Sequence, residues 1–229
     1  MVLGLGLTPL PTLILEETYQ IGCTQLELRL SKLHELGLAP PVKEIRVKQE
    51  PRGGPLFVCQ VFAHCDFPSF ANVHTLKLQE LDVIFLCKQR IENQLKRFPP
   101  TLRSVVMTNP RCTPRHLSHF LPLFPNLDDV EIRNSYTHVP NLNIDDTELV
   151  PFSGPKLGGR LVLFNFGWVE TWAHLISSCG NPWFRHLDIR MSVSCAPVLL
   201  ETCAETLETL RLHTSDGANG KYSARWFIR

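Results

Sequence analysis

The stretch Leu123 to Ile132 reads LFPNLDDVEI, and a line with the same skeleton returns at Ala204 to Leu212 as AETLETLRL. Each line contains an apolar residue, two variable residues, a second apolar residue, one variable residue and a third apolar residue. A skeleton that recurs along a chain is typical of a fold built from repeated units.

The skeleton occurs seven times when its middle apolar residue is taken as a marker. The shortest interval between markers is 23 residues, from Leu187 to Leu210, and the longest is 31, from Ile45 to Leu76. Gly158 stands at the first apolar position of the fifth line, which therefore fits least well. The lines are PVKEIRV, NVHTLKL, TLRSVVM, NLDDVEI, LGGRLVL, WFRHLDI and TLETLRL, with markers Ile45, Leu76, Val105, Val130, Leu161, Leu187 and Leu210.

Helix signals fill the segments between the lines. TPRHLSHFLPLF has Thr113 as N-cap and Pro114 at the first helical position, followed by apolar residues at helical spacing. Further helices are expected at residues 24–36, 81–98, 168–179 and within CAPVLLETCAETL. One short strand followed by one helix, repeated at these intervals, is the pattern of leucine-rich repeats.

We therefore predict an α/β fold: a leucine-rich-repeat solenoid with about seven strand-helix units and a parallel concave sheet. The solenoid is expected over residues 41–213, after an N-terminal helical capping segment at 1–40 and before a tail at 214–229. The asparagine that often follows the third apolar position is missing, although Asn109 and Asn134 stand one place earlier. This departure favours an irregular horseshoe.

One residue of each strand lies between the two core residues and must face the concave surface of the sheet. The row is basic at its start, mixed and acidic in the middle and basic at its end, so a partner of complementary charge would recognise it. The alternative is a solvated sheet face without a ligand. In order, the row is Arg46, Lys77, Val106, Glu131, Val162, Asp188 and Arg211. The candidate partner-binding residues are Arg46, Lys77, Asp129, Glu131, Arg133, Asp188, Arg190, Arg211 and His213.

Composition argues against several classes of partner. The net charge of this 229-residue chain is +1, from 23 basic and 22 acidic residues, so it has no overall field to attract nucleic acid or an anionic membrane.

Eight cysteines are expected to be reduced and mostly buried, because disulfide frameworks belong to small secreted domains. The apolar start, MVLGLGLTPLPTLIL, is short for a membrane span and is interrupted by two prolines. We expect a cytoplasmic or nuclear protein.

Motifs that carry enzymatic chemistry are missing from the sequence. It contains no Gly-x-Ser-x-Gly elbow, Walker loop or His-Glu-x-x-His. Cys59, His64 and Cys65 form a local cluster but lack the Cys-x-x-Cys spacing of zinc sites, so we expect core thiols beside a histidine and no metal or cofactor. A cysteine nucleophile that meets a histidine only in space is the remaining enzymatic alternative. We predict a non-enzymatic protein that binds another protein.

Three stretches resemble a known family: TNPRCTPRHLSHFLPLFPNLDDVEIRNSYTHVPN, GGRLVLFNFGWVETWAHLISSCG and CAPVLLETCAETLETLRL. From about Val73 to Leu212, the chain resembles the large leucine-rich-repeat, F-box-type protein family of mushroom-forming fungi. The resemblance implies an intracellular recognition domain, with the alternative of a substrate-recognition subunit of an SCF-type ubiquitin ligase.

The adaptor alternative depends on the N-terminal segment. LPTLILEETY, Leu10 to Tyr19, resembles an F-box opening, in which Leu-Pro is followed by an amphipathic helix. Leu13 stands where an acidic residue is usual, so the segment at 1–40 resembles a degenerate F-box remnant. A working F-box would add an Skp-type linker protein as partner.

Overall fold

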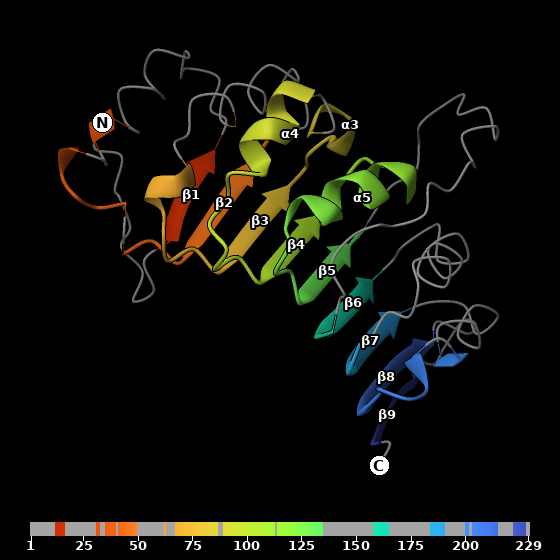
Figure 1. Ribbon diagram of the computed structural model, residues 1–229. Helices are drawn as coiled ribbons and strands as arrows, with labels where there is room; N and C mark the ends of the chain where they lie inside the picture. Colours follow the sequence, from red (N-terminus) through yellow and green to blue (C-terminus); the bar gives the residue numbers. More distant parts are fainter. Residues whose placement is uncertain are drawn as a thin grey trace.

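In the described residues, the computed structural model forms one sheet of nine strands, which lie side by side in chain order (Figure 1). Seven strands, β2 to β8, coincide with the seven lines of the skeleton. The structure describes residues 12–16, 31–32, 35–39, 41–49, 62, 67–86, 89–112, 114–134, 158–164, 184–190, 200–201, 203–214 and 222–227. The strands are β1 (Thr12–Glu16), β2 (Glu44–Lys48), β3 (Thr75–Gln79), β4 (Ser104–Thr108), β5 (Asp129–Arg133), β6 (Arg160–Phe164), β7 (His186–Arg190), β8 (Thr209–Thr214) and β9 (Tyr222–Phe227).

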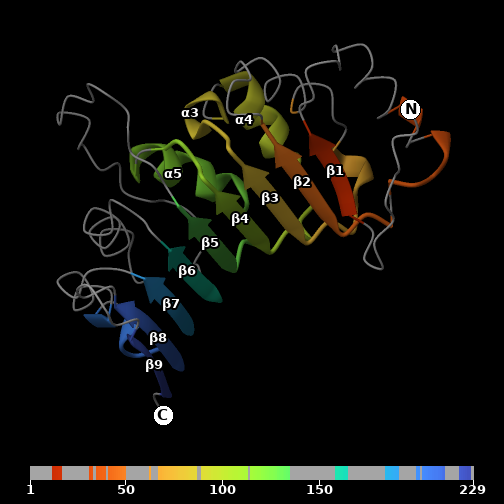
Figure 2. The ribbon, with the colours of Figure 1, turned by 180° about the vertical axis from the view of Figure 1, so that it is seen from behind.

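Strands β1 to β8 run parallel, and β9 runs antiparallel to β8 at the end of the sheet (Figure 2). The predicted α/β class and parallel sheet are therefore confirmed. The skeleton predicted these strands correctly because its apolar residues alternate with variable ones, which is the pattern of a strand with one buried face.

The seven markers are direct lateral neighbours in the sheet. Ile45 pairs with Leu76, Leu76 with Val105, and the pairing continues in the same way to Leu210. Two residues further along each strand, a second aligned row runs from Val47 to Leu212. A shift of one residue between neighbouring strands would turn every apolar residue of one strand out of the core, so burial enforces this register.

The described helices lie between consecutive strands, and their apolar residues join the core of the sheet. They are η1 (Phe67–Ser69), α3 (Val83–Leu86), α4 (Gln89–Leu95), α5 (Pro114–Phe120) and η2 (Leu121–Leu123). Leu117 and Phe120 of α5 are fully buried, as the helical spacing predicts. The predicted helix at 168–179 lies outside the described residues.

The predicted helix at 81–98 starts later than expected. Its described part contains α3 and α4, with residues 87 and 88 between them outside the described residues, and residues 81 and 82 precede the helix. Asp82 forms a bridge with Arg111, and the main-chain N–H of Arg111 donates to the carbonyl of Leu81 at 2.8 Å.

Aromatic rings connect the units within the core. Phe67 and Phe98 stack with ring centroids 4.1 Å apart, and Phe98 meets Phe124 edge-on at 5.7 Å. Each of these phenylalanines precedes a proline shortly before a strand, at residues 67–68, 98–99 and 124–125. This recurring Phe-Pro pair is a repeat signal that our sequence analysis missed.

The hydrogen bonds at the beginnings of the strands also follow a regular pattern. The carbonyl of Lys43 accepts the N–H groups of His74 and Thr75, and the carbonyl of His74 accepts those of Arg103 and Ser104. The pattern changes at β6, where the Asp129 carboxylate accepts the N–H of Arg160 at 2.8 Å.

Gly159 allows this change at β6. A Cβ atom on Gly159 would lie 2.9 Å from the Asp128 carbonyl oxygen and closer still to the carboxylate of Asp129. Gly159 stands at a variable position of the fifth line, and its backbone lies close to the neighbouring unit there.

Both ends of the chain differ from the sequence prediction. Residues 12–16, within the expected helical cap, form β1, which pairs with β2; they do not form the helix that would follow an F-box opening. The stretch TLILE suits a strand, because a β-branched residue alternates with leucine. The expected tail at 214–229 contains β9, and β8 extends to Thr214. None of the described helices is long and apolar enough to cross a membrane.

Val130→Asp tests the register of the sheet. We expect it to lower the free energy of unfolding by about 3 kcal/mol or more, because it places an unpaired carboxylate at a core position that is 1% exposed. Val106→Asp is the matched control: Val106 lies on the neighbouring strand but on the opposite face, so its change should stay below about 1 kcal/mol. Urea denaturation measures both, and equal losses would contradict the assigned faces.

Gly159→Ala tests the close approach at β6. Because the added methyl group overlaps the Asp128 main chain, we expect a loss of about 1 to 3 kcal/mol in the free energy of unfolding. Arg103 occupies the equivalent place before β4 and is exposed, so Arg103→Ala should cost less than about 1 kcal/mol. An unchanged urea midpoint for Gly159→Ala would show that the chain has room for the methyl group.

Candidate functional site

The outer face of the sheet, opposite the apolar core, carries the predicted row of side chains. Sheet pairing makes each member of the row the direct lateral neighbour of the next, from β2 to β8. The outer-face row consists of Arg46, Lys77, Val106, Glu131, Val162, Asp188 and Arg211. Its charged members fall into three groups along the sheet.

The N-terminal cluster comprises Glu44, Arg46 and Lys77, from β2 and β3. Arg46 donates to Glu44 Oε1 at 3.1 Å, and Lys77 Nζ lies 2.7 Å from Glu44 Oε2. Two cations therefore share one carboxylate, and the cluster carries one excess positive charge.

The central pair lies on β5. Arg133 forms an ion pair with Glu131, and the guanidinium carbon of Arg133 lies 5.4 Å from the centre of the Phe164 ring. This cation-π contact links the pair to β6. The neighbouring Asp129 uses its carboxylate to accept the main-chain N–H of Arg160, so that its role at this edge is structural.

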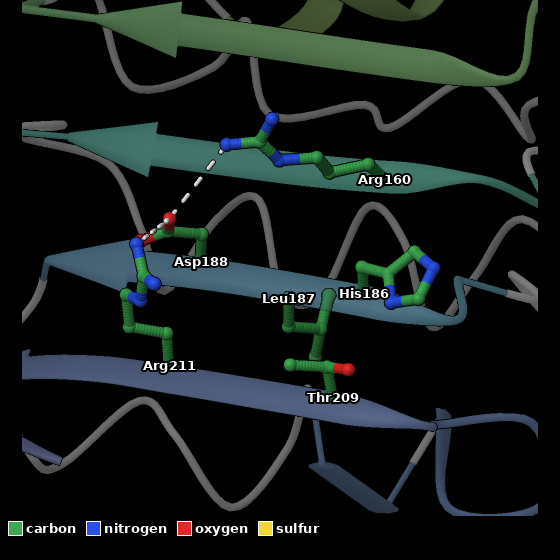
Figure 3. Close-up of a pocket in the computed structure, with 6 residues that line it drawn as sticks. All are labelled: Arg160, His186, Leu187, Asp188, Thr209 and Arg211. Carbon is green, nitrogen blue, oxygen red and sulfur yellow. Dashed lines mark hydrogen bonds and ion pairs between the residues drawn. The ribbon is translucent and has the colours of Figure 1, made fainter. Parts of the chain in front are cut away.

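The C-terminal cluster is built around Asp188, from β7. Arg211 and Arg160 approach Asp188 Oδ2 from the two flanking strands, with nitrogen-oxygen distances of 3.5 Å and 3.7 Å (Figure 3). His213 Nε2 lies 3.0 Å from the other oxygen, Oδ1. Asp188 is only 8% exposed, so three partly exposed cationic or titratable side chains surround a buried carboxylate.

A pocket of about 330 Å³ opens beside this cluster. Figure 3 shows the two arginines converging on Asp188, with His186 and Thr209 further along the strands. Arginine, histidine and hydroxyl groups from three neighbouring strands thus line one pocket, and the two guanidinium groups at one end of it are suited to binding an anion. The pocket is lined by Arg160, His186, Leu187, Asp188, Thr209 and Arg211.

The structure brings some predicted site residues together and separates others. Asp188, Arg211 and His213 share the C-terminal cluster, whereas Arg46 and Lys77 lie at the opposite end of the row. The backbone of Arg190 pairs with Phe164 and His213, while its side chain lies outside what the structure describes.

Two expectations about exposure need correction. Val162 is 1% exposed and Asp188 is 8% exposed, although both were expected to face the concave surface and Asp188 to bind a partner. The long side chains of Arg160 and Arg211 reach Asp188 from both neighbouring strands, which explains how a charged residue becomes buried on the outer face. Asp188 therefore positions the side chains of Arg160, Arg211 and His213.

Arg160 and Glu44 belong to the clusters but were not among the predicted partner-binding residues. Each is the first residue of its strand, two places before a member of the outer-face row, and side chains two apart share a face. The two-residue period of a strand therefore places Arg160 and Glu44 on the outer face from the sequence alone.

Cysteines and possible metal ligands among the described residues bear on catalytic or metal chemistry. No group of three or more histidine, cysteine, aspartate or glutamate side chains there is arranged to hold a metal ion. Cys59, His64 and Cys65 lie outside the described residues. Cys112 and Cys203 are buried cysteines outside disulfide bonds. Burial raises the pKa of Cys203 to about 11 despite a hydrogen bond with the Phe184 backbone, which is the opposite of nucleophile activation.

Comparisons with known proteins assign neither family nor activity. No protein-family model matches the chain, and no curated protein matches it. Among solved structures, it is similar to the tropomodulin C-terminal domain from Caenorhabditis elegans, with 12% identity and a TM-score of 0.43. The alignment covers 81% of this chain and 93% of that chain.

Asp188→Asn tests whether the buried carboxylate holds the C-terminal cluster together. We expect it to lower the free energy of unfolding by about 1 to 2 kcal/mol, because two guanidinium groups lose their shared counter-charge. Asp128→Asn is the control, since Asp128 faces Arg103 at 3.7 Å in an exposed pair and should change stability by less than about 0.5 kcal/mol. Urea denaturation compares them, and equal effects would argue against a structural role of Asp188.

Proposed function

We propose that this chain is a leucine-rich-repeat solenoid that works as a non-enzymatic protein-protein interaction module. A protein partner binds along the outer face. The observation that carries the proposal is the common register of β2 to β8, which aligns one side chain from each strand in a continuous row.

The length of the row suits a protein better than a small molecule. Neighbouring strands lie about 4.8 Å apart, so the six steps from β2 to β8 span about 29 Å. A typical protein interface covers about 800 Å² on each partner and requires a surface of this extent. The row also consists of side chains from many separate units, as in extended binding surfaces of repeat proteins.

The charge along the row favours a partner with acidic groups at two places. Each end cluster has two guanidinium or ammonium groups around one carboxylate, whereas the central pair is balanced. The two basic ends are separated by about five strand spacings, or about 24 Å. Complementary charge at both ends would orient the partner and accelerate its association.

A charge reversal along the row tests the proposal. The triple variant Lys77→Glu, Glu131→Lys and Arg211→Glu should fold but lose partners that the native chain retains. These side chains are partly exposed, so their ion pairs contribute little to stability, about 1 kcal/mol or less each. Affinity capture from the native cell, quantified by mass spectrometry, measures the partners.

The control carries the same charge changes on the helical side of the molecule: Lys96→Glu, Glu92→Lys and Arg97→Glu. Lys96 and Glu92 form an exposed ion pair of α4 and the turn after it, remote from the outer-face row. This variant should capture the same partners as the native chain. An identical partner set for the outer-face variant would contradict binding on this face.

A further inference from the structure

We propose that the pocket between Arg160 and Arg211 binds one carboxylate side chain, an aspartate or glutamate of the protein partner. The inference rests on the proposed function and adds the chemistry of the partner at one end of the row. It starts from the geometry of the C-terminal cluster, where the two arginines come from β6 and β8 and flank Asp188 (Figure 3).

Both arginines have hydrogen-bonding capacity to offer. Charge-assisted hydrogen bonds between guanidinium and carboxylate groups are typically about 2.7 to 2.9 Å long. Arg211 and Arg160 instead lie 3.5 Å and 3.7 Å from the same oxygen of Asp188. Each guanidinium has five N–H donors, and their side chains are 41% and 49% exposed. An incoming carboxylate would therefore meet donors that Asp188 engages only weakly.

The N-terminal cluster provides a comparison with shorter contacts in the same sheet. It too has two cations and one carboxylate, but its distances are 2.7 Å and 3.1 Å. Glu44 thus holds its cations closely, and they contribute mainly a long-range field. The looser contacts and the adjoining pocket mark the C-terminal cluster as the place for direct contact.

The local charge favours a carboxylate over a phosphate. Among the described side chains at the pocket, two guanidinium groups and Asp188 leave one positive charge, which a single carboxylate neutralises. A phosphate dianion would exceed that charge and would also be repelled by Asp188. His213 occupies the second oxygen of Asp188 and so fixes the orientation of this carboxylate.

The remaining lining suits an acidic side chain with an apolar stem. Thr209 contributes a hydroxyl group and His186 an imidazole, both able to hydrogen-bond to a carboxylate oxygen, while Leu187 adds an apolar wall. At about 330 Å³ the pocket has room for one side chain and part of its backbone. Asp188 is a positioning residue, and the two arginines make the contact.

Fluorescence anisotropy with a labelled short peptide of alternating glutamate and serine tests the pocket on the full chain. This glutamate peptide should bind at least about tenfold more tightly than the same peptide with glutamine. Arg160→Gln and Arg211→Gln should each weaken binding by about tenfold. Arg160→Lys should weaken it less than Arg160→Gln, because lysine keeps the charge but loses the planar fork. A thermal midpoint close to that of the native chain establishes that each variant is folded.

Arg103→Gln is the matched control, because Arg103 is similarly exposed and lies 3.7 Å from Asp128, outside the pocket. It should leave the dissociation constant within about twofold of the native value. If Arg160→Gln binds the glutamate peptide as the native chain does, the pocket assignment is wrong. A peptide with phosphoserine in place of glutamate that binds tenfold more tightly would overturn the carboxylate in favour of phosphate.

The outcome is separable from that of the proposed function. If the charge-reversed row still changes the partner set while Arg160→Gln leaves peptide binding intact, only the pocket assignment fails. If the peptide binds through Arg160 but the charge-reversed row captures the same proteins, the interaction module on the outer face fails.

Discussion

The lateral register of the parallel strands is the constraint on which the rest of the structure depends. Side chains alternate between the two faces of a strand, so one register choice places the markers from Ile45 to Leu210 in the core and the charged row outside. A slip of one residue at β3 would bury Lys77 and expose Leu76. Core stability and the order of charges on the outer face therefore have the same origin.

Neighbouring units also define where each strand ends. Glu80, Asn109 and Asn134 follow β3, β4 and β5 with φ angles of 57°, 52° and 53°, in the left-handed region. Each donates its main-chain N–H to the last residue of the next strand, at 2.8 to 2.9 Å. Asparagine tolerates this conformation better than most residues, and two of the three positions carry it. Each of these strands thus leaves the sheet at a residue that is hydrogen-bonded to the next strand, so each of these units depends on the one after it.

The sequence predicted what depends on local alternation and missed what depends on neighbours. The strands β2 to β8 and the buried face of α5 follow from apolar spacing within a single segment. Strand β9 lacks the skeleton, and β1 lies in a segment that resembled a different structure, so both were missed. The burial of Asp188 requires arginines from two other strands, which no single line of sequence contains. Arg160 lies in the fifth line, which fits the skeleton least well because Gly158 occupies its first apolar position.

A nearly neutral chain carries an excess of positive charge in the two end clusters of its outer face. The three charged groups of the outer face contain five cations, namely Arg46, Lys77, Arg133, Arg160 and Arg211, but only three carboxylates. Every one of those carboxylates already faces a cation of its own chain, so the excess is positive and lies at the two ends. The net charge of the chain does not reveal this excess, because acidic residues elsewhere in the chain balance it. Since Asp188 holds its arginines only loosely, the proposed external carboxylate would compete for their N–H groups at that end, whereas Glu44 holds its two cations at shorter distances at the other.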